Sequence, residues 1–295
     1  MAGQARPVGR EGASEVVGDA GGERSTALSL PGGERFISRS VLRLGPCPVG
    51  FALMSWAGEF VFGESAAAYR GPSADNTFHV HAAIQLVLAE TGRATVAAAD
   101  GREYIGAAIL IRPLIEHVLS SRGLVTLLYA EPQSTLASHL EGLARHADIS
   151  IIEPSVVPEC RASEPLDRWL VRVAGSFPRK RIIDARLEMA LAVLSRQPGT
   201  YSIREAAMQC GLSGSRLRVL ASTQLGLPLS TWLIWRKLER AARAISEGEA
   251  LSMAAAAGGF ADQAHLARAM RRMFGITPRS AQLSALLSDN RSVQE

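Results

Sequence analysis

A small residue followed four positions later by glycine occurs twice near the C-terminus, and this repeat restricts the fold more than any other feature. Ala207 precedes Gly211, and Ala255 precedes Gly259. In a helix-turn-helix unit the first helix needs a small residue where the second helix packs closely, and the turn needs glycine for its positive φ. We therefore predict two such units in tandem.

Apolar residues stand where each unit needs the inner face of its second helix. Leu217 and Leu220 serve the first unit, and Leu266 and Met270 serve the second, whose turn is one residue longer. The helical spacing of apolar residues predicts a series of helices over 182–196, 203–210, 214–225, 229–247, 251–257 and 262–274, and near 278–287. Because Ala254–Gly258 lacks large apolar residues, we expect the helix over 251–257 to pack loosely and to order fully only on DNA.

The charge of the chain is distributed unevenly. Residues 179–280 carry 16 Lys and Arg against 7 Asp and Glu, whereas residues 1–178 carry 15 against 19. A basic segment attached to an acidic remainder is typical of a domain that binds a polyanion such as nucleic acid. A solvated basic face without a partner is the alternative.

The segment GGFADQAHLARAMRRMFGITP, residues 258–278, combines Gly-Phe, a His-apolar pair, an Arg-rich helix and Phe-Gly-x-x-Pro. It resembles the signature of the AraC/XylS family of transcription regulators, and the resemblance covers about residues 182–283. The connecting helix also matches the family pattern, at Arg236, Leu238, Glu239, Ala241 and Ala242. The resemblance implies two recognition helices that enter successive major grooves of promoter DNA.

The resemblance also implies which residues contact DNA. Residues early in each recognition helix would read base edges, because Arg and Gln can bind guanine or adenine bidentately. In the first helix and its cap these candidates are Ser213, Gly214, Ser215, Arg216 and Arg218, and in the second they are Asp262, Gln263, His265 and Arg268. Five basic residues fit phosphate contacts, which set register without reading sequence: Arg236, Lys237, Arg240, Arg271 and Arg272.

The N-terminal half has a different pattern. Short apolar runs at 78–88, 94–99, 107–112 and 124–130, separated by turn residues, predict a small barrel or sandwich. We predict an α+β multidomain chain, a β-rich cupin-like domain followed by an all-α domain. The expected division is a disordered leader at 1–33, a sensor and dimerisation domain at 34–150, a linker at 151–180 and the DNA-binding domain at 181–288. Helices are expected at 134–146 and 166–176, and either helix is a candidate dimer contact.

Three histidines in the β-rich half form a second candidate site. His79-Val80-His81 and the later His117 resemble the His-x-His and third histidine of cupin metal sites. Gln85 stands where cupins place an acid, and an amide is a poor ligand beside a carboxylate. We therefore favour a cupin-like fold without metal or other cofactor. His79, His81, Gln85 and His117 become candidates for binding a small effector, which the AraC/XylS resemblance also implies.

A third candidate is the pair Arg35 and Arg39, whose spacing resembles the Arg-x-x-x-Arg element that holds cyclic di-GMP in PilZ-type domains. Two forked guanidinium groups can clamp phosphates. The partner element of those domains is not evident, and arginines that flank an edge strand and stay hydrated are the alternative.

Two hypotheses for function follow. The first is a cytoplasmic, homodimeric regulator, an activator that contacts RNA polymerase, in which the β-rich half senses an effector and the helical half binds DNA. Three widely separated cysteines, Cys47, Cys160 and Cys210, fit a reducing compartment, and no apolar run is long enough for a membrane span. The alternative is a metal-dependent cupin enzyme with a basic helical appendage.

Overall fold

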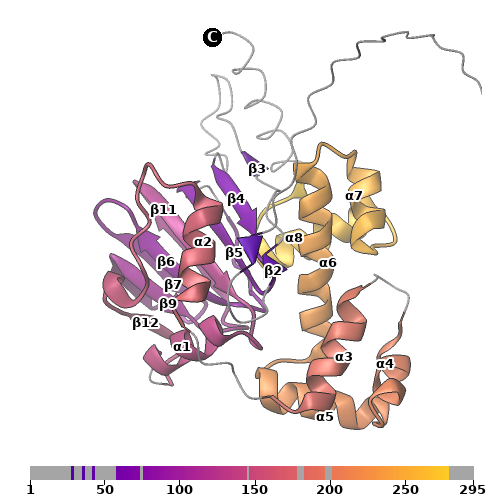
Figure 1. Cartoon of the computed structure of the whole chain (residues 1–295). Coiled ribbons are helices and arrows are strands. Elements are labelled where there is room, and N and C mark those ends of the chain that lie inside the picture. Colours follow the sequence, from indigo (N-terminus) through magenta and orange to yellow (C-terminus); the bar gives the residue numbers. More distant parts are fainter. Residues whose placement is uncertain are drawn as a thin grey trace, which may run out of the picture.

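The computed structural model describes residues 58–73, 76–144, 146–177, 183–196 and 201–278, and the backbone of three short strands at 28–29, 35–36 and 42–43. It confirms a β-rich N-terminal part followed by a helical C-terminal part (Figure 1). No helix in these ranges is both long and apolar enough to span a membrane. The predicted helix at 278–287 lies outside them after its first residue.

The N-terminal part contains a seven-stranded sheet in the order β12-β9-β6-β11-β5-β4-β3 and a three-stranded sheet in the order β10-β7-β8. Every strand pairing is antiparallel. The strands of the two sheets are β3 Leu42–Arg43, β4 Glu59–Phe62, β5 Ala66–Pro72, β6 Ile84–Ala89, β7 Ala94–Ala98, β8 Glu103–Gly106, β9 Ala108–Ile111, β10 His117–Ser121, β11 Leu124–Ala130 and β12 Ile149–Ile151. β1 (Leu28–Ser29) pairs with β2 (Arg35–Phe36). β1 therefore places a strand inside the segment predicted to be a disordered leader.

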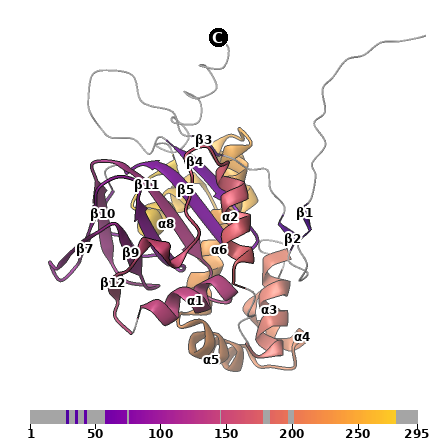
Figure 2. The same ribbon diagram turned by 60° about the vertical axis from the view of Figure 1, so that its left-hand side comes forward.

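Both faces of the larger sheet are buried, which explains why its strands are apolar almost throughout. Side chains alternate between the faces of a strand. Leu127 and Tyr129 of β11 belong to the core that continues into the helical domain, here called the inner core. Leu128 and Ala130 belong to the core beneath the helices α1 (Thr135–Leu143) and α2 (Leu166–Gly175), here called the outer core. The outer face is covered by α1 and α2, as Figure 2 shows.

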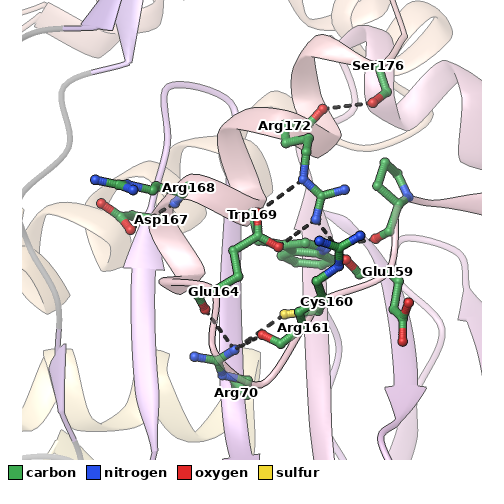
Figure 3. A network of polar contacts seen from close by, with 11 residues as sticks. Arg70, Glu159, Cys160, Arg161, Glu164, Asp167, Arg168, Trp169, Arg172 and Ser176 are labelled. Atoms are coloured by element: carbon green, nitrogen blue, oxygen red, sulfur yellow. Dashed lines mark hydrogen bonds and ion pairs between the residues drawn. The ribbon is translucent and has the colours of Figure 1, made fainter.

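The helix α2 is fixed to the sheet rather than forming part of a free linker (Figure 3). Trp169 is fully buried, and its Nε1 donates to the carbonyl of Pro158 at 2.8 Å. Arg172 forms an ion pair with Glu164 at 2.5 Å, and Arg70 of β5 donates to the carbonyl of Glu164 at 3.0 Å. We therefore propose that the N-terminal domain extends to the end of α2.

The apolar faces of α1 and α2, each a predicted dimer contact, are buried within the same chain. α1 buries Leu136, Ala137 and Leu140, and α2 buries Leu166, Trp169, Leu170 and Val173. These residues pack in the outer core of the same chain. The apolar face of each helix is thus already occupied, and dimerisation would have to use other surfaces.

The helices of the C-terminal part form close to their predicted bounds. They are α3 Ala185–Arg196, α4 Ile203–Gln209, α5 Gly214–Leu225, α6 Leu229–Ser246, α7 Leu251–Gly258 and α8 Gln263–Phe274. Gly211 and Gly259 have φ of +68° and +73°, the left-handed backbone that the two turns require. The two tandem units are α4 with α5, and α7 with α8.

The expectation that α7 packs loosely is wrong. A Cβ added at Gly258 would lie 2.8 Å from the carbonyl oxygen of Lys237 and 2.9 Å from Cβ of Ala241, so the backbones of α6 and α7 are in close contact. Ala254 and Ala255 are buried. Small residues here permit close approach of two helices instead of leaving a gap.

Gly258→Ala tests this contact. We expect it to lower the free energy of unfolding by about 1–3 kcal/mol, because overpacking forces a backbone shift. Gly142→Ala in α1 is the matched control, since no atom lies within 4 Å of its added Cβ. There the substitution is expected to add about 0.5–1 kcal/mol. Urea unfolding of both variants measures the difference, and a Gly258→Ala protein at least as stable as the native one would contradict the close contact.

Candidate nucleic-acid interface and domain junction

α5, the first predicted recognition helix, presents basic residues to solvent. Arg216 and Arg218 are exposed, whereas Leu217 between them is fully buried. The hydroxyl of Ser213 accepts a hydrogen bond from the backbone N–H of Arg216 at 3.2 Å, so this side chain caps the helix. Ser215 is exposed, and Gly214 is half-buried in the first turn. The two arginines are therefore the charged side chains that this end of α5 offers to a partner.

α8, the second predicted recognition helix, has the same division between a buried and an exposed face. Leu266 and Met270 are buried. All six predicted contact residues of this unit are exposed: Asp262, Gln263, His265, Arg268, Arg271 and Arg272. The carboxylate of Asp262 accepts from the backbone N–H of His265 at 2.6 Å. Asp262 thus caps the helix.

The first unit lies at one end of the connecting helix, and α7 of the second unit lies at the other end. Figure 1 shows α3, α4 and α5 at one end of α6 and α7 at the other. The 18 residues of α6 span about 27 Å at 1.5 Å per residue. Successive major grooves on one face of DNA lie roughly 34 Å apart. The length of α6 alone is therefore somewhat shorter than that spacing.

Two basic residues of α6 that were predicted to contact phosphate bond to the protein itself, whereas the contact of Arg240 stays a prediction. Arg236 lies 2.6 Å from the carboxylates of both Glu131 and Glu239, and Lys237 donates to the carbonyl of Gly259 at 2.7 Å. Arg240 is partly buried, and burial followed by the charge of Arg236 lowers its pKa. The partner Glu131 lies 105 positions away in the chain, so local sequence gave no indication of this role.

α6 and α8 join the C-terminal domain to the N-terminal domain. Nε1 of Trp232 donates to the side-chain carbonyl of Gln133 at 3.2 Å, and Arg243 donates to the carbonyl of Gly63 at 3.0 Å. The end of α8 is held by a backbone hydrogen bond of 3.0 Å from Val80 to Arg272. The two domains are therefore joined by specific hydrogen bonds, and one apolar core continues from one domain into the other.

The predicted histidine site lies at this junction. The run predicted as a strand from residue 78 becomes regular only at Ile84, and the preceding segment forms an isolated bridge between His79 and His117. The ring centroids of His79, His81 and His117 lie 4.5–5.2 Å apart. Oε1 of Gln85 lies 2.9 Å from Nε2 of His117. The structure thus brings together all four residues that the sequence grouped.

Burial keeps the three imidazole rings neutral. It lowers the pKa of His79, lowers that of His81 well below its usual value, and lowers that of His117 to about 3. Positive charge on His79 or His117 would also lower the pKa of His81, and positive charge on His79 would lower that of His117. The cluster therefore offers nitrogen lone pairs near neutral pH instead of positive charge.

Aromatic side chains from both domains enclose the cluster. The ring of His81 has its centroid 5.0 Å from that of Tyr129 on β11, 6.4 Å from Trp235 on α6 and 5.8 Å from Phe274 on α8. Sequence reasoning missed Trp235 and Phe274 as parts of this site. Helical spacing marks both as inward-facing but does not say that they face another domain.

Two pockets lie elsewhere. One of about 390 Å³ sits at the junction between the N-terminal domain, α3 and α6, and one of about 920 Å³ lies over the outer face of the large sheet near Cys160. Of the predicted arginine pair, Arg35 is on β2, where only the backbone is described, and Arg39 lies outside the described residues.

A β-rich domain packed on two helix-turn-helix units with exposed basic recognition helices defines a class, the two-domain DNA-binding regulators. Residues 208–283 match a family model described as a helix-turn-helix domain. No curated protein matches the sequence of the chain.

Solved structures resemble the whole arrangement. Apo ToxT of Vibrio cholerae, in a lysine-to-alanine variant, has a TM-score of 0.51 and 10% identity over 76% of this chain and 98% of its own. ToxT bound to an unsaturated fatty acid has a TM-score of 0.48 and 12% identity over 74% and 94%. An RmlC-like cupin of Shewanella frigidimarina has a TM-score of 0.22 and 15% identity over 28% and 87%.

The first of these likenesses shows the same two-domain fold. The family match shows a helix-turn-helix domain in the C-terminal part, and the signature at 258–278 resembles that of AraC/XylS regulators. The chain is a DNA-binding transcription regulator.

Proposed function

We propose that the chain regulates transcription by placing α5 and α8 in successive major grooves of promoter DNA, under the control of a small effector bound in the N-terminal domain. The observation that carries the proposal is the pair of recognition helices, each with exposed basic residues and each fixed to α6. An alternating buried and exposed face is what a helix needs to rest on its domain while reading a groove.

Each predicted contact residue then has a role. Arg216, Arg218, Gln263 and Arg268 read base edges, with Gly214, Ser215 and His265 close to the same groove. Arg271 and Arg272 contact phosphate. Ser213 and Asp262 cap the two helices and can contact the backbone of DNA through the same turn.

The junction supplies a route for control. A ligand that changes the conformation of the N-terminal domain at the junction would shift α6 and α8, because both helices contact that surface directly. Coupling between two such sites is on the order of 1–3 kcal/mol. His79, His81, Gln85 and His117 are our candidates for the effector site, and binding of cyclic di-GMP at Arg35 and Arg39 stays a prediction.

The remaining parts of the proposal concern the assembly. We infer a homodimer acting on repeated half-sites, activation through contact with RNA polymerase, and action in the cytoplasm, where bacterial-type promoters are. We also infer that the chain is not an enzyme, because Gln85 stands where a metal-dependent cupin enzyme would place a carboxylate ligand.

Removing one base-reading side chain at a time tests the DNA interface. We expect Arg216→Ala and Arg268→Ala each to weaken binding to a preferred genomic fragment by about 1–3 kcal/mol, which is roughly tenfold to hundredfold. Discrimination against altered base pairs should relax in each variant. Mobility shifts across a salt series measure both effects.

Arg102→Ala is the control for charge. It also removes one exposed arginine, but on a β-hairpin of the N-terminal domain. Its binding should stay within about twofold of the native protein, since exposed charges more than a Debye length away are screened. Equal weakening by all three substitutions would mean that total charge alone drives binding and would contradict the assignment of α5 and α8.

A further inference from the structure

The histidine cluster has the donor arrangement of a metal site. The candidate ligand atoms of His79, His81 and His117 all lie within 4.8 Å of one another, and the three side chains are 5%, 2% and 0% exposed. Neutral imidazole is a ligand for zinc, copper, iron and nickel. Three buried imidazole groups around one point are unusual in a protein core, because burying apolar side chains costs less free energy than burying polar ones.

Two of the rings are held as metal-bound histidines are held. Nδ1 of His79 lies 2.8 Å from the carbonyl oxygen of Thr77, and Nδ1 of His117 lies 2.8 Å from that of Ile115. Donation from Nδ1 of His79 leaves a lone pair on its Nε2, whereas Nε2 of His117 lies 2.9 Å from Oε1 of Gln85 and becomes a ligand only when Gln85 turns aside. Metal-ligating histidines almost always donate their other ring N–H to a carboxylate or carbonyl in this way.

The third ring needs a partner that the protein does not supply. Neither Nδ1 nor Nε2 of His81 makes a hydrogen bond, although the backbone of Met273 and the amide of Gln85 lie nearby. A buried polar atom left without a partner costs about 1–3 kcal/mol. A cation bound among the three rings would satisfy His81 and the free Nε2 of His79 together, and would take the place of Gln85 at Nε2 of His117.

We propose that His79, His81 and His117 bind one divalent first-row transition metal ion, and that the occupied site strengthens the docking of α8 on the N-terminal domain. The first half stands on geometry alone, whereas the regulatory half rests on the proposed function. Gln85 holds the ring of His117 instead of supplying the carboxylate of a cupin site.

The link to α8 is direct. Gly275, which ends α8, has φ of +69°, and a Cβ added there would lie 3.0 Å from Nδ1 of His79 and 2.7 Å from the carbonyl oxygen of Thr77. The carbonyl of Thr77 is the one that orients His79. Phe274 closes the other side of His81. An ion that fixes His79 and His81 therefore fixes the surface on which α8 ends.

Metal titration of the tag-free full chain after chelator treatment and dialysis tests the site without DNA. We expect one Zn²⁺ per chain by calorimetry, a rise in thermal unfolding temperature, and visible absorption with Co²⁺ as the probe. His79→Gln and His117→Gln should each weaken binding by more than about 100-fold, beyond the 10- to 100-fold of an outer-shell change. His146→Asn is the matched control: it removes an exposed histidine at a positive φ that asparagine tolerates, and binding should be unchanged.

Tryptophan fluorescence reports whether the metal site lies against the C-terminal domain. Bound Co²⁺ should quench this fluorescence, and Trp235→Phe should remove most of the quenching. Less than about a tenth of an ion per chain, or binding that survives both glutamine substitutions in proteins with native circular dichroism, would overturn the site. Specific DNA binding without metal binding would defeat this inference and leave the proposed function intact. Metal binding without specific DNA binding would do the reverse.

Discussion

Glu131→Gln is expected to destabilise the junction between the two domains by about 3–5 kcal/mol, the usual cost of removing one partner from a buried ion pair. The carboxylate of Glu131 is 3% exposed and lies 2.6 Å from Nη1 of Arg236, which is 17% exposed. Gln133 also donates to this carboxylate. Without it, the buried guanidinium keeps Glu239, which it shares with Arg243, and a hydrogen bond of 3.3 Å to the carbonyl of Glu64.

The expected result in scanning calorimetry is a lower unfolding temperature, with the single transition broadening or splitting as the domains unfold separately. Glu59→Gln is the matched control, because it removes a carboxylate from Arg70 within the N-terminal domain. Arg70 keeps its hydrogen bonds to the carbonyls of Arg161 and Glu164. We expect a loss of under about 1 kcal/mol there. Equal losses in the two variants would show that Arg236 does not depend on Glu131.

Gly275→Ala is the second substitution with a large expected effect. It adds a Cβ where the left-handed backbone disfavours one, at about 1–2 kcal/mol, and pushes that Cβ into the backbone of Thr77 at 2.7 Å. Because backbone cannot give way cheaply, α8 must separate from the N-terminal domain. We expect a total loss of roughly 2–5 kcal/mol, by adding the cost of overpacking.

Gly226→Ala at the end of α5 isolates the contribution of docking. Its φ is +73°, and no atom lies within 4 Å of the added Cβ. The two variants share the conformational cost, so the difference between their free energies of unfolding in urea reports the contact with Thr77. Losses that agree within about 0.5 kcal/mol, the usual limit of additivity, would mean that α8 is not held at this point.

Local pattern predicted most of the elements, because their signals are contained in a few residues. The caps Ser213 and Asp262 and the turn glycines Gly211 and Gly259 gave the bounds of the helices around them. Strand β11 reads as an apolar run at 124–130 and forms over those residues. The segment before Ile84 also reads as strand, but its backbone bonds to His117 and to the end of α8 instead of joining the sheet.

Features that depend on distant partners were not predictable. Arg236 reads as a phosphate contact on a basic helix, and only the position of Glu131 shows it to be an interdomain ion pair. Gly258 reads as weak packing until Lys237 and Ala241 are seen against it. The four residues of the histidine site could be grouped from sequence, but its closure by Trp235 and Phe274 depends on how the domains dock.

The most direct test of specific DNA binding through two tandem units is a footprint of the purified full chain on DNA upstream of genes adjacent to its own. We predict a discrete protected site in which each chain covers two segments about one helical turn, or 10 base pairs, apart on one face of the duplex. Arg216→Ala should lose the protection of one segment and Arg268→Ala that of the other. Uniform protection that falls away with salt at every sequence alike, or a single segment that both substitutions weaken equally, would contradict the assignment.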